Sequence, residues 1–196
     1  MNSKKSDNSF DRRTYLIATG AVTAGLVPLA GCLGDDATGT LVTHVTDQPG
    51  DIADFDSCVV TIVGMWLGPE EAEAGDDEDV EPSGREYYEY DEPQEADLVD
   101  LQGENTQLVD EREFDVSTYE FLQLDTDGID ATLEDGSSAT VEVPGEAPLT
   151  FNQQFEVREN TRTEFTADFT PVRRGQTESY VLQPVPDGIT VRYEDE

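Results

Sequence analysis

The sequence predicts an all-β domain, an antiparallel β-sandwich, preceded by a signal peptide. From Thr40 onward, apolar and polar residues alternate in runs of about four to eight residues, as in strands with one buried face. Turn-forming residues separate these runs, and no stretch has a helical apolar period of useful length. Many short strands at this spacing favour two stacked antiparallel sheets.

Residues 1–31 are predicted to be a twin-arginine signal peptide. Arg12 and Arg13 are adjacent and are followed by a polar residue, Tyr15 and Leu16, an order that resembles the twin-arginine export motif. The apolar stretch 16–30 is interrupted by glycine, threonine and proline. It is shorter than the roughly 20 apolar residues that a spanning helix needs, which is typical of a signal peptide. Weak hydrophobicity beside paired arginines favours twin-arginine export over general secretion.

Leu29, Ala30, Gly31 and Cys32 resemble a lipobox, the cleavage and lipidation motif of exported lipoproteins. Small residues before the cysteine let a peptidase close on the bond, and the sulfur can take a diacylglycerol-type group as a thioether. Two acyl chains make a stable anchor where one is marginal. The alternative, an incidental cysteine, leaves the upstream arginines unexplained. We therefore expect residues 32–39 to be a lipidated cysteine and tether, holding the domain at the extracytoplasmic face of the membrane.

The charge of the chain restricts its partners and its solvent. There are 45 acidic residues against 11 Lys and Arg, a net charge of −34, and both lysines precede Cys32. Nucleic acid is excluded as a partner because binding it depends on basic residues, and an anionic lipid surface would repel the domain. The clean alternation argues against disorder, the other outcome of high charge. At about 1 M salt the Debye length is roughly 3 Å, so we interpret the composition as that of a halophile.

The domain is predicted to cover residues 40–196. Asp127-Gly128 and Asp135-Gly136 are predicted to be tight hairpin turns, because glycine there supplies the positive φ that such turns need. The acidic segment 68–84 is predicted to be a solvated hairpin excursion that is mobile and dispensable for stability. The predicted strands are residues 40–46, 58–67, 85–90, 96–100, 107–113, 119–125, 129–133, 139–143, 154–158, 162–169, 180–184 and 188–193.

Four stretches of this domain, in this order, carry a resemblance to a known family. They are Thr40-Leu41-Val42-Thr43-His44-Val45-Thr46-Asp47-Gln48-Pro49, Ala96-Asp97-Leu98-Val99-Asp100-Leu101, Tyr119-Glu120-Phe121-Leu122-Gln123-Leu124 and Tyr180-Val181-Leu182-Gln183-Pro184-Val185. From Thr40 to about Arg192 the chain resembles domain-of-unknown-function family 4382, found in archaeal and bacterial lipoproteins. Gln48 departs from the alanine of the family's Thr-Asp-Ala-Pro turn. The resemblance implies a transthyretin-like or immunoglobulin-like sandwich, implies no catalytic residues and, with the signal and composition, indicates a haloarchaeal surface lipoprotein.

Motifs for catalysis are absent from the sequence. His44 is the sole histidine and lies within a predicted strand, with no nucleophile and orienting acid at a recognisable spacing. Cys58 lies in a β-branched run and is predicted to be a buried apolar residue that forms no disulfide, since Cys32 is used by the anchor. Paired carboxylates for hydrolysis can be found anywhere in so acidic a chain, so none is diagnostic.

Two binding hypotheses remain beside a non-enzymatic surface module. Asp125, Asp127 and Asp130 surround a glycine turn and are candidate ligands for calcium, which takes six to eight oxygens. The order of these residues is not that of an EF-hand, and an ordinary turn on an acidic surface is the alternative. Trp66 and the tyrosines at 87, 88 and 90 are candidates for a sugar-binding platform, although alternation puts Tyr87 on the opposite face from Tyr88 and Tyr90.

We therefore expect a lipid-anchored, extracytoplasmic module without enzymatic activity. Its expected partners are the membrane, through the anchor, and an envelope protein or glycan. No cofactor is expected, with calcium as the alternative. A carboxylate-dependent hydrolase is the second alternative.

Overall fold

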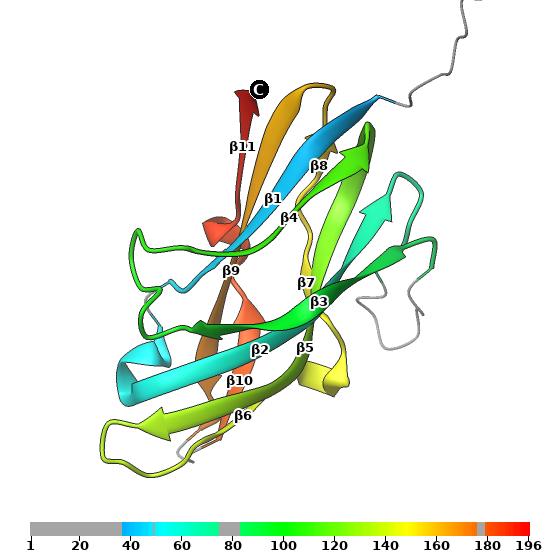
Figure 1. Cartoon of the computed structure of the whole chain (residues 1–196). Helices are drawn as coiled ribbons and strands as arrows, with labels where there is room; N and C mark the ends of the chain where they lie inside the picture. Colours follow the sequence, from blue (N-terminus) through cyan, green and yellow to red (C-terminus); the bar gives the residue numbers. More distant parts are fainter. Residues whose placement is uncertain (1–36, 49, 75–82, 176–178) are drawn as a thin grey trace, which may run out of the picture. The chain divides into compact units, whose positions relative to one another are not determined.

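Two β-sheets stack face to face in the computed structural model, which describes residues 37–48, 50–74, 83–175 and 179–196 (Figure 1). These residues belong to the second of two units into which the chain divides, residues 35–196. The predicted signal peptide and lipobox lie outside the described residues. No helix within the described ranges is long and apolar enough to cross a membrane. The predicted sandwich is confirmed.

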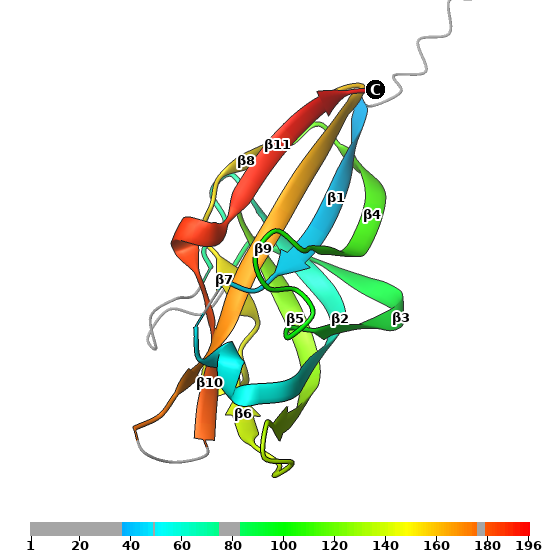
Figure 2. The same ribbon diagram turned by 90° about the vertical axis from the view of Figure 1, so that its left-hand side faces the viewer.

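The first sheet contains the two ends of the domain. Its strand order is β4-β1-β9-β10-β6. Strand β11 also pairs with β9, along the part of β9 that precedes the part paired with β10. Figure 2 shows β10 and β11 lying in succession along one side of β9. The β1–β9 and β6–β10 pairs are parallel, and the other pairs are antiparallel. The strands are β1 (Thr38–Thr46), β4 (Gln107–Asp115), β6 (Thr140–Glu142), β9 (Thr161–Arg173), β10 (Ser179–Pro184) and β11 (Thr190–Asp195).

The second sheet is wholly antiparallel and has the order β3-β2-β5-β7, with β8 also paired to β5. Its strands are β2 (Phe55–Pro69), β3 (Glu86–Asp97), β5 (Ser117–Leu133), β7 (Leu149–Phe151) and β8 (Phe155–Val157). Three short 3₁₀ turns join strands: η1 (Asp51–Asp54), η2 (Pro144–Glu146) and η3 (Pro186–Gly188). Strand β7 was not predicted, because three residues are too few to show alternation.

The core lies between the sheets and follows from the alternation of the strands. On β2, Cys58, Val60 and Ile62 are fully buried, while the residues between them are partly exposed. Met65 and Leu67 continue this face and pair with Leu124 and Leu122 of β5, which are also fully buried. Each such side chain contributes roughly 1.5–3 kcal/mol when removed from water.

One predicted hairpin turn is wrong. Asp127 and Gly128 lie inside β5, where Val60 pairs with Ile129 and Ile62 pairs with Thr126. The two residues are therefore a bulge, and Gly128 has φ of 130°. Glycine supplies an unusual φ to a bulge as readily as to a turn, and the long strand β2 pairs with β5 on both sides of it. Thus the predicted strands 119–125 and 129–133 are one strand.

The other predicted Asp-Gly turn is confirmed. Gly136 has φ of 84° and its N–H donates to the carbonyl of Leu133, while Leu133 donates to the carbonyl of Ser137. This turn reverses the chain, and Thr132 then bridges to Ser138. The chain leaves the second sheet here and enters the first as β6.

Strand β3 includes most of the predicted strand 85–90 and only the first two residues of the predicted strand 96–100, because residues 98–100 form a turn. Gly64 of β2 pairs with Glu89 and Ile62 pairs with Gln94, so residues 90–93 bulge out of the ladder. Pro93 lies in this bulge on an edge strand, where a missing N–H costs no ladder bond. The predicted excursion 68–84 begins inside β2, and an antiparallel bridge between Glu73 and Ser83 gives it a hairpin base. Residues 75–82 lie outside the described residues.

Candidate functional site: a cleft between two edge strands

A hollow of about 850 Å³ lies where the two sheets end side by side. β3 is the edge of the second sheet and β4 is the edge of the first. The lining residues are Glu89, Tyr90, Asp91, Glu92 and Gln94 of β3, and Val109, Asp110, Glu111 and Arg112 of β4. We call this hollow the edge cleft.

The register of β4 turns Asp110 and Arg112 toward the space between the sheets. Thr43 of β1 pairs with Asp110 and His44 pairs with Leu108, so the ladder is irregular at Val109. Beyond this point, alternate residues share one face, and Phe114 on that face is buried in the core. Asp110 and Arg112 therefore point inward with Phe114.

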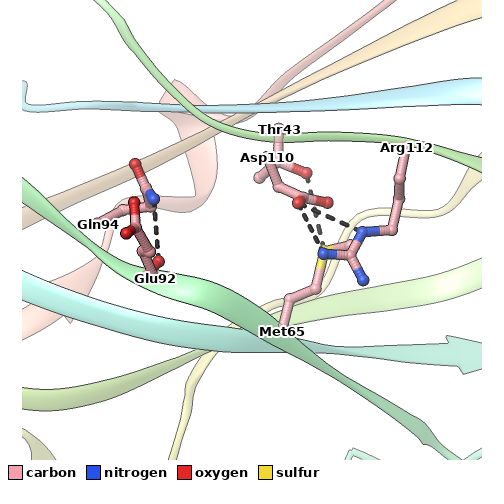
Figure 3. Close-up of polar contacts among 6 residues, drawn as sticks. All are labelled: Thr43, Met65, Glu92, Gln94, Asp110 and Arg112. Atoms are coloured by element: carbon pink, nitrogen blue, oxygen red, sulfur yellow. Dashed lines mark hydrogen bonds and ion pairs between the residues drawn. The ribbon is translucent and has the colours of Figure 1, made fainter.

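Asp110 and Arg112, which both line the edge cleft, form a charged pair (Figure 3). Oδ1 of Asp110 accepts hydrogen bonds from Nη2 of Arg112 at 2.9 Å and from Nε at 3.3 Å. The Arg112 guanidinium also lies 5.8 Å from the ring of Tyr90 and 5.9 Å from that of Tyr88. Burial raises the pKa of Asp110, while the bonds from Arg112 act in the opposite direction.

Two buried polar atoms of the edge cleft have no hydrogen-bond partner among the described residues. They are Oδ2 of Asp110 and the hydroxyl of Tyr90. Tyr90 is only 8 % exposed, and burial raises its pKa, with Asp110 nearby adding to the effect. A buried polar group without a partner costs roughly 1–3 kcal/mol. These two atoms therefore have unused hydrogen-bonding capacity in residues that line the cleft.

Hydrogen bonds between and within strands fix the residues around Asp110 and Arg112. Thr43 of β1 donates to the sulfur of Met65 on β2 at 3.9 Å, which connects the two sheets beside Asp110 (Figure 3). On the β3 side, Nε2 of Gln94 donates to the carbonyl of Glu92 at 3.0 Å, within the bulge. The bulge of β3 thus provides one wall of the edge cleft and β4 the other.

Adjacent acids on β4 do not form a carboxylate pair facing the cleft. Consecutive residues of a strand point to opposite faces, so Glu111 points away from Asp110. Glu111 instead accepts hydrogen bonds from Arg162 at 2.6 and 3.1 Å, which lower its pKa. Asp110, Arg112 and Tyr90 supply one carboxylate, one guanidinium and one phenol, which suit hydrogen bonding to hydroxyl groups. Glu89, Asp91 and Glu92 of β3 also line the cleft.

The predicted calcium ligands lie on β5, away from the edge cleft. Asp125 accepts a hydrogen bond from Tyr87 at 3.1 Å, and with Asp127 it lines a second hollow of about 670 Å³ beside β6. Asp130 is exposed and pairs with Val59 beyond the bulge. Within the described ranges, no three acidic, histidine or cysteine side chains are grouped to hold a metal ion. Calcium binding by these residues remains a prediction.

The predicted facing of the tyrosines is confirmed. Tyr90 is buried and Tyr88 packs edge-on against Phe114 at 4.8 Å, while Tyr87 is 39 % exposed on the other face. The ring centroids of Tyr87 and Trp66 are 4.5 Å apart. The guanidinium carbon of Arg85 lies over the Trp66 ring, 4.0 Å from its centroid. The aromatic residues therefore form no single platform, and Tyr87 alone among them is an exposed aromatic.

The remaining predicted residues take ordinary places or lie outside the described residues. His44 is half-buried in β1, with Nδ1 3.5 Å from the Thr106 hydroxyl. Cys58 is a free, fully buried thiol whose pKa burial raises to about 12, as expected of an apolar role. Arg12, Arg13, Leu29, Ala30, Gly31 and Cys32 lie outside the described ranges.

Asp110 and Arg112 were missed by sequence reasoning. Their spacing of two residues in a predicted strand places them on one face, which was a usable signal. In a chain with 45 acidic residues, an acid two positions from an arginine is not distinctive. Which face is inward depends on the irregularity at Val109, and that is set by pairing with β1.

A family model described as "Domain of unknown function (DUF4382)" matches residues 38–184. This chain belongs to the DUF4382 family. The match begins at the first residue of β1 and ends at the last residue of β10, so it includes the second sheet, the first sheet except β11, and the edge cleft. No curated protein matches the chain. The resemblance to the family is thus confirmed, and the family description assigns no molecular function.

Proposed function

We propose that this DUF4382 domain is a non-enzymatic binding module, anchored by lipid on Cys32 outside the cell membrane, that binds a neutral, hydroxyl-rich ligand in the edge cleft. Such a ligand has the chemistry of an envelope glycan. Export is supported by Arg12 and Arg13, and lipidation by the run Leu29-Ala30-Gly31-Cys32. A surface with a net charge of −34 supports work in concentrated salt, where screening is strong.

The observation that carries the ligand proposal is the pair of unpartnered buried atoms, the Tyr90 hydroxyl and Oδ2 of Asp110. Both belong to residues that line one hollow. Arg112 supplies donors, Asp110 an acceptor and Tyr90 both, so a sugar hydroxyl can bond to any of them. Surrounding carboxylates at Glu89, Asp91 and Glu92 disfavour anionic ligands.

The alternatives are a divalent-cation-binding module and a hydrolase. A hydrolase needs two carboxyl groups on either side of the scissile bond, whereas Asp110 and Glu111 point to opposite faces of β4. A cation-binding role through Asp125, Asp127 and Asp130 has the support of their sequence spacing. The edge cleft has the stronger support, because it combines a hollow with unpartnered buried atoms.

The ligand proposal is tested by binding of neutral envelope oligosaccharides to the exported chain in concentrated salt. Tyr90→Phe should abolish or greatly weaken binding, yet leave stability unchanged or raised, because it removes a buried hydroxyl without a partner. Tyr193→Phe is the matched control: it removes a hydroxyl from the first sheet, where Tyr193 accepts a bond from Glu156 N–H at 3.1 Å. Equal glycan affinity for wild type and Tyr90→Phe would refute the assignment of the cleft.

The anchor is tested separately in membrane fractions. Cys32→Ser should move the domain from the membrane to the soluble fraction, and Arg12→Lys with Arg13→Lys should block export. Retention of the serine variant on membranes would refute lipid anchoring at Cys32. This outcome is independent of glycan binding, so the two halves of the proposal can fail separately.

A further inference from the structure

Two buried carboxylates lie outside the edge cleft, at the end of β1 and on β9. Asp47 follows directly after β1, and Thr46 pairs with Asp168 in the parallel ladder between β1 and β9. Both aspartates have 0 % relative exposure. Neither was predicted as a site residue, although Asp47 belongs to the Thr-Asp-Gln-Pro turn.

The backbone around Asp47 is firmly held. Its N–H donates to the carbonyl of Leu101 at 3.2 Å, and the hydroxyl of Thr46 donates to the carbonyls of Leu101 at 3.1 Å and Asn105 at 2.7 Å. These bonds fix the position of the side chain at the end of the strand. The end of β1, where the Asp47 carboxylate is buried, is therefore bonded to residues 101–105.

Most polar side-chain atoms of Asp47, Asp168 and Thr170 have no hydrogen-bond partner among the described residues. Both carboxylate oxygens of Asp47, Oδ2 of Asp168 and the hydroxyl of Thr170 have none among the described residues. The Thr170 hydroxyl lies near enough to Asp47 to lower its pKa, although the two groups do not have hydrogen-bond geometry. Oδ1 of Asp168 accepts from the N–H of Gln48 at 3.0 Å.

The site is closed by two neighbouring backbone segments. A Cβ atom on Gly50 would lie 2.8 Å from the Thr170 hydroxyl, so Gly50 itself lies close to this hydroxyl. A Cβ on Gly188 of η3 would lie 1.7 Å from Oδ2 of Asp168. Asp168 and Thr170 are two residues apart on β9 and so share a face. We call Asp47, Asp168 and Thr170 the buried acid site.

We propose that the buried acid site binds one divalent cation, with calcium as the ion. Two buried carboxylates carry two negative charges, and burying an uncompensated charge is costly unless it is paired or coordinates a metal. Thr170 and Asp168 act on the Asp47 carboxyl, and Gln48 acts on that of Asp168. Among the described residues, no arginine forms an ion pair with either carboxyl. A divalent cation matches the charge and uses the carboxylate and hydroxyl oxygens that have no partner.

Calcium is favoured over magnesium by the ligands. Calcium accepts carboxylate, hydroxyl and carbonyl oxygens in flexible geometry, whereas magnesium demands near-ideal octahedral geometry and keeps several waters. The Thr170 hydroxyl, which is 9 % exposed and has no partner, is a third oxygen beside the two carboxylates.

The test uses the exported chain, freed of metal with chelator and kept in concentrated KCl at pH 7.5. Calcium alone is the probe, followed by magnesium, in calorimetric titration and thermal unfolding. We expect saturable heat and a calcium-dependent rise in Tm, with a smaller effect of magnesium. Asp47→Asn and Asp168→Asn should abolish both signals, and Thr170→Val should raise the Kd by about tenfold.

The control is a triple variant of the other acidic candidate, with Asp125, Asp127 and Asp130 all changed to Asn. It should bind calcium as the wild type does. In chelator, Asp47→Asn should be at least as stable as the wild type, because it removes a buried charge, so loss of calcium binding cannot be attributed to misfolding. Absence of saturable heat in the wild type would overturn the proposal. Loss of binding in the triple variant alone would also overturn it and would assign calcium to β5.

Discussion

Gly188 lies so close to Asp168 that a Cβ atom at that glycine would be 1.7 Å from Oδ2 of the carboxyl group. The η3 turn is held over β9 by two backbone bonds: Val185 N–H donates to the carbonyl of Asp168 at 2.8 Å, and Gly188 N–H donates to that of Val185 at 3.0 Å. The turn between β10 and β11 thus covers the Asp168 side chain. Only a residue without a side chain fits this position.

Gly188→Ala should destabilise the domain by about 1–3 kcal/mol, since the new methyl group must displace either η3 or the Asp168 side chain. Denaturant unfolding measures the loss. Asp168→Ala removes the two nearest atoms that the methyl group meets, Oδ2 and Cγ, and leaves only Cβ at 2.8 Å, so Gly188→Ala should cost less in that background. A double-mutant cycle without coupling between the two changes would contradict the contact.

The buried acid site should make the stability of the domain depend on pH. Burial, with Asp168 adding to it, raises the pKa of Asp47 from 3.8 to about 7, and burial raises that of Asp168 to about 6. Between pH 4 and pH 7 the folded protein then binds more protons than the unfolded chain. In chelator, these two groups should therefore make stability fall as the pH rises through this range.

Asp47→Asn should flatten this slope, as measured by Tm from pH 4.5 to 7.5. The groups near Asp47 are Asp168, Thr170 and Cys58, and the thiol does not titrate in this range because its pKa is about 12. Asp135→Asn is the control. Ser137 lowers the pKa of Asp135 below 3.8, so its titration lies under the range measured. Identical slopes for wild type and Asp47→Asn would contradict the prediction.

Salt should stabilise this domain strongly. The chain has a net charge of −34, and self-repulsion at this density opposes the compact state in dilute salt. Tm should therefore rise steeply with KCl up to about 1 M, where the Debye length is roughly 3 Å. Part of any rise comes from stronger hydrophobic burial, so the control is the same series at pH 4, where many carboxylates are protonated. A salt dependence of equal size at both pH values would exclude screening as the cause.

Two Asp-Gly pairs show how far local sequence decides a turn. Asp135-Gly136 ends β5, whereas Asp127-Gly128 lies inside it as a bulge. Both glycines have positive φ, so the local conformational signal is the same. The difference is that β2 offers pairing partners on both sides of residue 128, and the strand resumes there. That partner is distant in sequence, and period-two patterns alone do not reveal it.

The two sites differ from the predicted ones for a similar reason. Asp110, Arg112 and Tyr90 come together because the edges of two sheets, β3 and β4, lie side by side. Asp47 and Asp168 come together because β1 pairs in parallel with β9, across more than half of the chain. By contrast, Asp125, Asp127 and Asp130 are close in sequence, but β5 spreads them along a strand with a bulge between them.

Four ordered stretches of the sequence carried the resemblance to the DUF4382 family, which the family model confirms. The sequence by itself also determined the fold class and the positions of most strands. These follow from period-two alternation, which is local, because one side of each strand must be apolar to be buried. Only the tertiary structure decided which acids are buried and which turns are bulges. Burial and strand register both depend on partners that are distant in the sequence. In a chain so rich in carboxylates, no local pattern distinguishes the few buried carboxylates from the many that stay exposed to solvent.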